Sequence, residues 1–216
     1  NEESCAVSGT TRTNISLANQ TRLTNNDYIE IVSINCVDTD STAASGSMKL
    51  TFKDVGDYNF INDVFDITIE VALTDFVVST LGVNVNMVGT YEMDIDSTYN
   101  GYSTVINADS FQTSVEPGFR QDISDLTINE SYSDNTNVYT LNVSNRVFDS
   151  GLNGTVAVTT VTDFEFFYSL DSAPRQGTLM IKGANNSNML IEVLNSGLID
   201  VKVDADGDNV YVSKDH

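Results

Sequence analysis

The chain has 216 residues, and its 31 acidic residues against 10 basic ones give a formal net charge of −21 at pH 7. A surface this acidic repels phosphate groups and anionic lipid headgroups. We therefore expect neither nucleic acid nor a membrane surface among its partners. No apolar run approaches the roughly 18 residues of a membrane-spanning helix, and the sequence predicts no transmembrane segment. A hydrophobic content of 40% is enough for a folded core.

Apolar and polar residues alternate most clearly between Val83 and Asp96, where the odd positions are apolar apart from Gly89. The even positions of the same run are almost all polar. A period of two indicates a β-strand that buries one face and exposes the other. The apolar set is Val83, Val85, Met87, Tyr91, Met93 and Ile95.

Further strands are expected along the first half of the chain, with a break at Gly56 to Asn59. They cover residues 6–15, 28–35, 48–53 and 65–74. Weaker segments follow at 103–107 and 111–115, and further strands at 121–130, 137–147 and 156–161. A final meander covers 178–181, 189–194, 198–203 and 209–212, and turn signals occur at Asn100-Gly101, Glu116-Pro117-Gly118, Asn153-Gly154 and the loop 171–176.

No long apolar segment has a helical period with caps at its ends. The pattern therefore predicts a single all-β domain over residues 1–216, an antiparallel meander that forms a large curved sheet, half-barrel or barrel. A β-sandwich is the alternative. Strands of about a dozen residues are longer than the usual five or six, which favours one large sheet.

Cys5 and Cys36 are the two cysteines, and their spacing fits no C-x-x-C motif. In a hairpin of the first two strands, Cys5 at the start of one lies opposite Cys36 at the end of the other. We expect a disulfide and hence an oxidising compartment, with two buried thiols as the alternative.

Asp204, Asp206 and Asp208 surround Gly207 near the end of the chain. Closely spaced carboxylates can bind Ca²⁺, although Gly comes fourth here and the Glu that completes an EF-hand loop is missing. The alternative is an Asp/Gly hairpin turn. Calcium is the one cofactor for which the sequence offers candidate ligands.

Catalytic motifs are scarce, because His216 is the only histidine and no phosphate-binding glycine motif occurs. Carboxylate pairs carry no information in so acidic a chain, and no enzymatic activity is expected. The aromatic cluster Phe164, Phe166, Phe167 and Tyr168 fits core packing, with a ligand cavity or a sugar platform as the alternative.

The stretch 176–212 has a Gly-led strand, a second Gly turn, a "VL" strand and a strand that closes in an Asp/Gly turn. Together with YIEIVSINC (28–36) and ASGSMKLTF (44–52), it resembles a group of exported bacterial β-proteins of unknown function, many of them lipoproteins. The resemblance covers about a third of the chain. It implies an exported all-β protein located in the periplasm, at the outer membrane or outside the cell.

The leading hypothesis is a non-enzymatic envelope protein whose concave sheet binds an apolar small molecule, such as a lipid or an acyl chain. Alternatives are a surface interaction or adhesion module that binds an envelope protein, and a calcium- or carbohydrate-binding β module. The sequence gives no indication of how many copies of the chain associate. The sequence leaves open whether a lipid anchor is attached upstream of residue 1.

Overall fold

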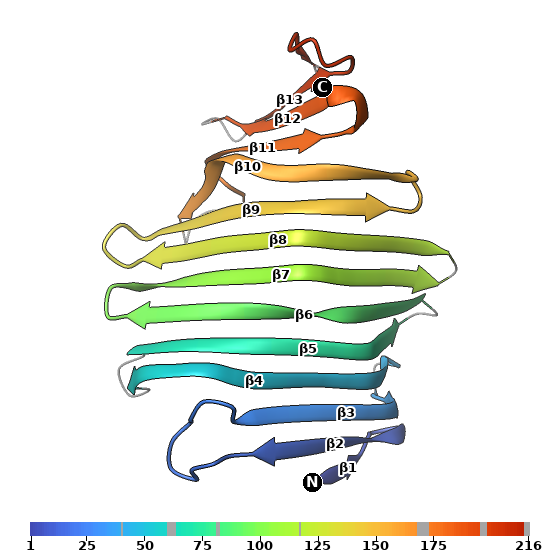
Figure 1. Ribbon diagram of the computed structural model, residues 1–216, viewed down its shortest axis with the longest axis vertical. Coiled ribbons are helices and arrows are strands. Elements are labelled where there is room, and N and C mark those ends of the chain that lie inside the picture. Colours follow the sequence, from blue (N-terminus) through green and yellow to red (C-terminus); the bar gives the residue numbers. More distant parts are fainter. Residues whose placement is uncertain are drawn as a thin grey trace.

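The computed structural model describes residues 1–39, 41–59, 64–80, 83–116, 118–167, 173–194 and 198–213. They form one antiparallel sheet of fourteen strands, in which every strand pairs with its neighbours in sequence (Figure 1). The strands are β1 Glu2–Ser4, β2 Ser8–Ser16, β3 Tyr28–Val37, β4 Ala43–Asn59, β5 Val64–Thr80, β6 Val83–Thr98, β7 Gly101–Glu116, β8 Phe119–Ser133, β9 Val138–Asp149, β10 Gly154–Phe167, β11 Gln176–Lys182, β12 Asn188–Val193, β13 Ile199–Asp204 and β14 Val212–Ser213.

The prediction of an all-β antiparallel meander is confirmed, and the large curved sheet is the form it takes. The sheet is not closed into a barrel, since β1 and β14 lie at opposite ends of the strand order. The described residues contain no α-helix, only the short 3₁₀ turn Ala184–Asn186. In Figure 1 the longest strands lie in the middle, and the sheet narrows toward both ends of the chain.

Residues directly opposite one another in an antiparallel pair point to the same side of a sheet, so the register assigns every strand residue to a face. One row crosses β4 to β9 on what we name the apolar face. Its members are Phe52, Ile69, Met93, Ile106, Ile128 and Val143. A parallel row on the opposite side, the polar face, consists of Thr51, Glu70, Glu92, Asn107, Thr127 and Ser144.

β-Bulges interrupt several of the long strands. Asn35, Asp75 and Asp125 lie in bulges of β3, β5 and β8 with φ of 47°, 46° and 53°. Asn and Asp are the non-glycine residues that adopt this left-handed conformation most readily. Because each bulge adds a residue and bends its strand, the row of bulges curves the sheet.

Two expected strand boundaries are wrong for the same reason. Residues 103–107 and 111–115 are one strand, β7, in which Ala108 and Asp109 form a bulge opposite Tyr91. The break expected at Gly56 is another irregularity, through which β4 continues to Asn59. The turn at Pro117, the aromatic Tyr168, residues 171 and 172 of the loop 171–176 and His216 lie outside the described residues.

Burial is shallow for a chain of this length. The described residues include only five buried apolar side chains, among them Val71, which is 2% exposed, and Ile67, which is 5% exposed. Both lie on the apolar face of β5, which pairs with β4 on one side and β6 on the other. A single layer of sheet has no second layer to complete a core, so most of its apolar side chains stay half-buried.

The disulfide between Cys5 and Cys36 is confirmed, with the two Cα atoms 5.4 Å apart. It joins the loop between β1 and β2 to β3, and Thr11 Oγ1 lies 3.2 Å from Cys36 Sγ. A disulfide is consistent with a location outside the reducing cytoplasm. The strand β1, which covers the edge of β2, has only three residues and was not predicted.

Candidate functional site

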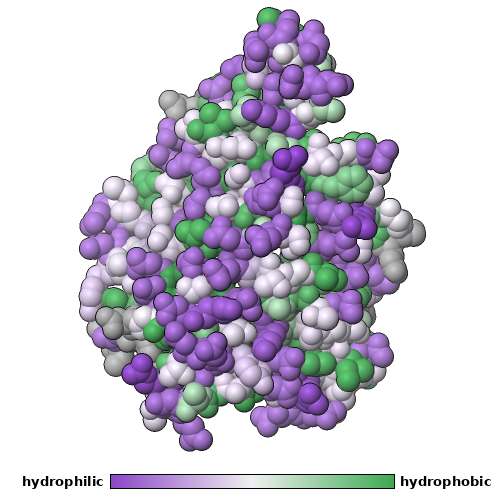
Figure 2. Space-filling view, in the orientation of Figure 1, coloured by the Kyte–Doolittle hydropathy of each residue, from purple (hydrophilic) through white to green (hydrophobic). Residues whose placement is uncertain are grey.

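The apolar face is the most extensive surface feature of the sheet. Besides the central row, a second row of apolar residues runs through Ile29, Leu50, Val71 and Tyr91. Among the described residues paired across β3 to β13, only Glu130 and Asp149 bring a charge to this face. The net charge of −21 is therefore concentrated on the polar face and in the loops. Figure 2 shows one face of the molecule, on which hydrophilic side chains dominate and hydrophobic ones form small separate groups.

Among the polar groups on the apolar face are a hydrogen-bonded tyrosine and an asparagine. Tyr139 Oη donates a hydrogen bond of 2.7 Å to Glu130. Burial raises the pKa of Tyr139, and this hydrogen bond raises it further, so the phenol stays protonated and keeps donating. The second group is Asn145, opposite Val158, whose buried Oδ1 has no hydrogen-bond partner. An unpaired buried acceptor is costly, and a ligand with a donor group would remove that cost.

Aromatic side chains of β10 lie at one end of the apolar face. Phe166 packs edge-on against Tyr139 with ring centroids 5.6 Å apart, and Phe164 lies against Gly177 of β11. Phe167, by contrast, lies under the guanidinium of Arg175, 3.5 Å from the ring centroid. Phe164 and Phe166 thus pack within the sheet surface, as the core interpretation expected.

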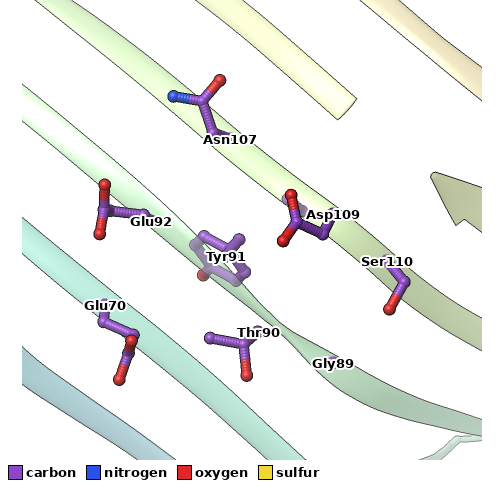
Figure 3. Close-up of a pocket in the computed structure, with 9 residues that line it drawn as sticks. Glu70, Gly89, Thr90, Tyr91, Glu92, Asn107, Asp109 and Ser110 are labelled. Carbon is purple, nitrogen blue, oxygen red and sulfur yellow. The ribbon is translucent and has the colours of Figure 1, made fainter. Parts of the chain in front are cut away.

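The polar face has a hollow of about 510 Å³ over β5 to β7 (Figure 3). The carboxylates of Glu70, Glu92 and Asp109 stand on three neighbouring strands around it. Glu70 and Glu92 lie directly opposite each other, and Lys53 Nζ lies 3.4 Å from Glu70. The three carboxylates concentrate negative charge in this hollow. Like charges directly opposite each other destabilise a sheet, so the pair of Glu70 and Glu92 costs stability.

The structure brings the predicted calcium ligands together. One carboxylate oxygen each of Asp204, Asp206 and Asp208 lies within 4.8 Å of the others. Asp204 is buried, and its two oxygens accept hydrogen bonds from the backbone N–H groups of Gly207 (2.8 Å) and Asn209 (3.0 Å). Burial raises the pKa of Asp204, but these bonds outweigh it and lower the pKa overall.

Those hydrogen bonds give Asp204 a structural role in its own turn, the alternative that the sequence left open. Asp206 and Asp208 are exposed, and Asp208 Oδ1 accepts the N–H of Val210 at 2.7 Å. Calcium needs about six to eight oxygens. Three carboxylates supply a part of that set, and calcium binding stays a prediction.

Exposed apolar side chains gather at the C-terminal edge of the sheet. Leu198 is 66% and Ile199 65% exposed, and Val210 and Val212 are similarly open. Strand β14 pairs with β13 at only two residues, Lys202 and Val203. Within the described part of the chain, β14 pairs with no residue of β13 from Ile199 to Val201, which makes this edge a second candidate contact surface.

Sequence reasoning missed the hollow and the unpaired Asn145. Gly89 and the break in alternation at Ala108–Asp109 could have indicated the hollow, because both lie near the place where the register between β6 and β7 shifts. Nothing in the sequence distinguishes Asn145 from the other asparagines, since its importance comes from the apolar residues across the strands.

Comparison with known proteins gives no match to any family model, curated protein or solved structure. The resemblance to exported β-proteins therefore stays an expectation. None of the described helical segments has the length and apolar character needed to cross a bilayer.

Proposed function

We propose that this chain is a non-enzymatic, exported envelope protein that binds an apolar ligand, such as a lipid acyl chain, along its apolar face. The observation that carries the proposal is that this face is almost free of charge and that no other element of the described chain covers it. Monomeric proteins rarely leave apolar patches larger than a few hundred Å² open, and such patches mark binding surfaces.

The polar groups of the apolar face indicate which kind of ligand fits it. The side-chain amide of Asn145 belongs to this face and offers a neutral polar group to a hydroxyl or amide group of the ligand. Glu130 is already bonded to Tyr139 and leaves the middle of the face without a free charge. A ligand with an apolar chain and one neutral polar end fits this arrangement better than a fatty acid that must place its carboxylate there.

The test is titration of the folded protein with an environment-sensitive apolar dye, followed by displacement with a neutral monoacylglycerol or a fatty acid. We expect saturable dye binding that the neutral lipid reverses. The Ile106→Lys variant places a charge on the apolar face and should weaken binding at least tenfold. Ser103→Lys, on the polar face of the same strand, should bind as the unmodified protein does. Absence of dye binding by the folded protein would refute the proposal.

A second function, an interaction module, is favoured by the exposed apolar edge around Leu198, Ile199 and Val210. In that case an envelope protein would add a strand beside β13. Dye binding that survives Ile106→Lys but is lost in Ile199→Lys would favour this second function.

A further inference from the structure

The chain exposes far more surface than a compact protein of its size. Its accessible surface is 13156 Å² for a mass of 23.5 kDa. A globular monomer of that mass exposes about 9,800 Å², which leaves an excess of about 3,400 Å². This excess follows from the fold, since one sheet layer exposes both of its faces.

A bound lipid cannot account for an excess of that size. An acyl chain of about 15 methylene groups has about 500 Å² of surface, at roughly 30 Å² for each methylene. The sheet is about 60 Å wide, from fourteen strands spaced about 4.8 Å apart. A ligand therefore covers a strip of the apolar face and leaves most of it open.

We propose that two copies of this chain pair through their apolar faces and form a symmetric homodimer. The inference concerns the same face as the proposed function but needs no ligand, which would lie between the two sheets. Each partner in an obligate homodimer contributes about 1,000–2,500 Å², and half of the excess, about 1,700 Å² for one face, lies within that range. In a two-fold dimer the same patch meets itself, and an apolar patch with only two charged residues complements itself.

The distribution of charge selects this face over the others. Two polar faces would bring Glu70 and Glu92 of each copy against the same residues of the other copy, which like charge opposes. On the apolar face the central carboxylate, Glu130, is already bonded to Tyr139. Pairing by the apolar faces leaves the acidic surfaces of the two chains outside and in solvent.

The experiment is sedimentation velocity of the delipidated full chain from about 1 to about 100 μM, which spans weak to tight association. We expect a species of twice the 23.5 kDa chain mass. Raising the salt from about 0.1 to about 1 M shortens the screening length from about 10 to about 3 Å, so dimerisation should strengthen as the acidic chains repel less. Dimerisation that weakens in high salt would contradict apolar pairing.

Adjacent residues of β8 provide the matched variants. Ile128 lies on the apolar face, whereas Asn129 is exposed on the polar face. Ile128→Asp should weaken dimerisation by about 100-fold or more, because both copies lose a buried side chain and gain a charge. Asn129→Asp should leave it unchanged. Ile128→Thr keeps the strand propensity and should weaken dimerisation at least tenfold, which covers the case in which the Asp variant does not fold.

A wild-type chain that stays monomeric throughout, or a dimer that both Ile128 variants leave intact, would overturn the inference. A dimer lost only in Ile199→Lys would place the contact at the C-terminal edge and would also overturn it. A monomer that still binds the apolar dye would refute the dimer while leaving the proposed function in place.

Discussion

The backbone of Gly177 lies against the ring of Phe164, and a Cβ atom at residue 177 would occupy the space of that ring. Gly177 also has a φ of 145°, which side chains rarely adopt. The contact joins β10 to β11 at the point where their register shifts. A glycine here lets an aromatic side chain fill the sheet surface where the ladder is irregular.

Gly177→Ala should therefore destabilise the protein by about 1–3 kcal/mol through overpacking. The measurement is urea unfolding followed by circular dichroism. Phe164→Leu added to this variant should recover part of the loss, since the smaller side chain leaves room for the new methyl group. Gly118→Ala is the control, because nothing lies within 4 Å of a Cβ there although its φ is also positive. Equal losses in the two alanine variants would show that backbone strain, not the ring, is the cause.

Reduction of the Cys5–Cys36 disulfide should destabilise the fold by about 3–4 kcal/mol in the loop-entropy model. The bond closes a loop with a sequence separation of 31 residues and holds β1 and β2 against β3. Unfolding with and without reductant measures the effect. Alkylation of the native protein without reductant should add no label, and a doubly labelled chain would contradict the bond.

Glu92→Lys should stabilise the sheet by about 0.2–1 kcal/mol, because it turns a like-charge pair with Glu70 into an ion pair. Glu92→Gln removes the repulsion without adding a positive charge and should give a smaller gain. Both gains should shrink in about 1 M salt, where the screening length falls to about 3 Å. Gains that do not depend on salt would show that charge is not their cause.

Asp27 should make stability depend on pH in acid. It is 3% exposed, and its carboxylate accepts the N–H groups of Ala18 at 2.7 Å and Thr24 at 2.8 Å. The bond from Ala18 is the largest cause that lowers the pKa of Asp27. Since the native pKa is below the unfolded value of about 3.9, this stabilisation is complete above about pH 4 and is lost as the pH falls through the native pKa.

Asp27→Asn should therefore lower the melting temperature at pH 7 and flatten its decline below about pH 4. Asp66→Asn, which removes an exposed carboxylate from the polar face, is the control for the change in charge. An Asp27→Asn variant with the same acid sensitivity as the unmodified protein would contradict this role.

The sequence predicted the two faces of the sheet well where alternation is unbroken, as from Phe65 to Leu73 in β5. It failed where a bulge changes the phase, because Asp75 in a bulge and an aspartate in a loop look alike in the sequence. Strand β1 could not be predicted, since the polar segment Glu2–Ser4 pairs through its backbone alone.

The candidate sites show the same limit. The Cys5–Cys36 pairing followed from hairpin order, which is local information. The two interpretations of Asp204 could be separated only by seeing which backbone N–H groups its oxygens accept. The near absence of charge on the apolar face depends on the register of the strands from β3 to β13, and no single segment of the sequence contains it.

The most direct test of the central claim is photocrosslinking of the folded protein with a diazirine-labelled neutral lipid, with the labelled residues identified by mass spectrometry. The account predicts labels on apolar-face side chains of the central strands, such as Met93, Ile106 and Ile128. Excess unlabelled lipid should abolish them. Labels confined to the C-terminal edge around Leu198 and Val210, or labels on the polar face around Ser103, would contradict the claim that the apolar face binds the ligand.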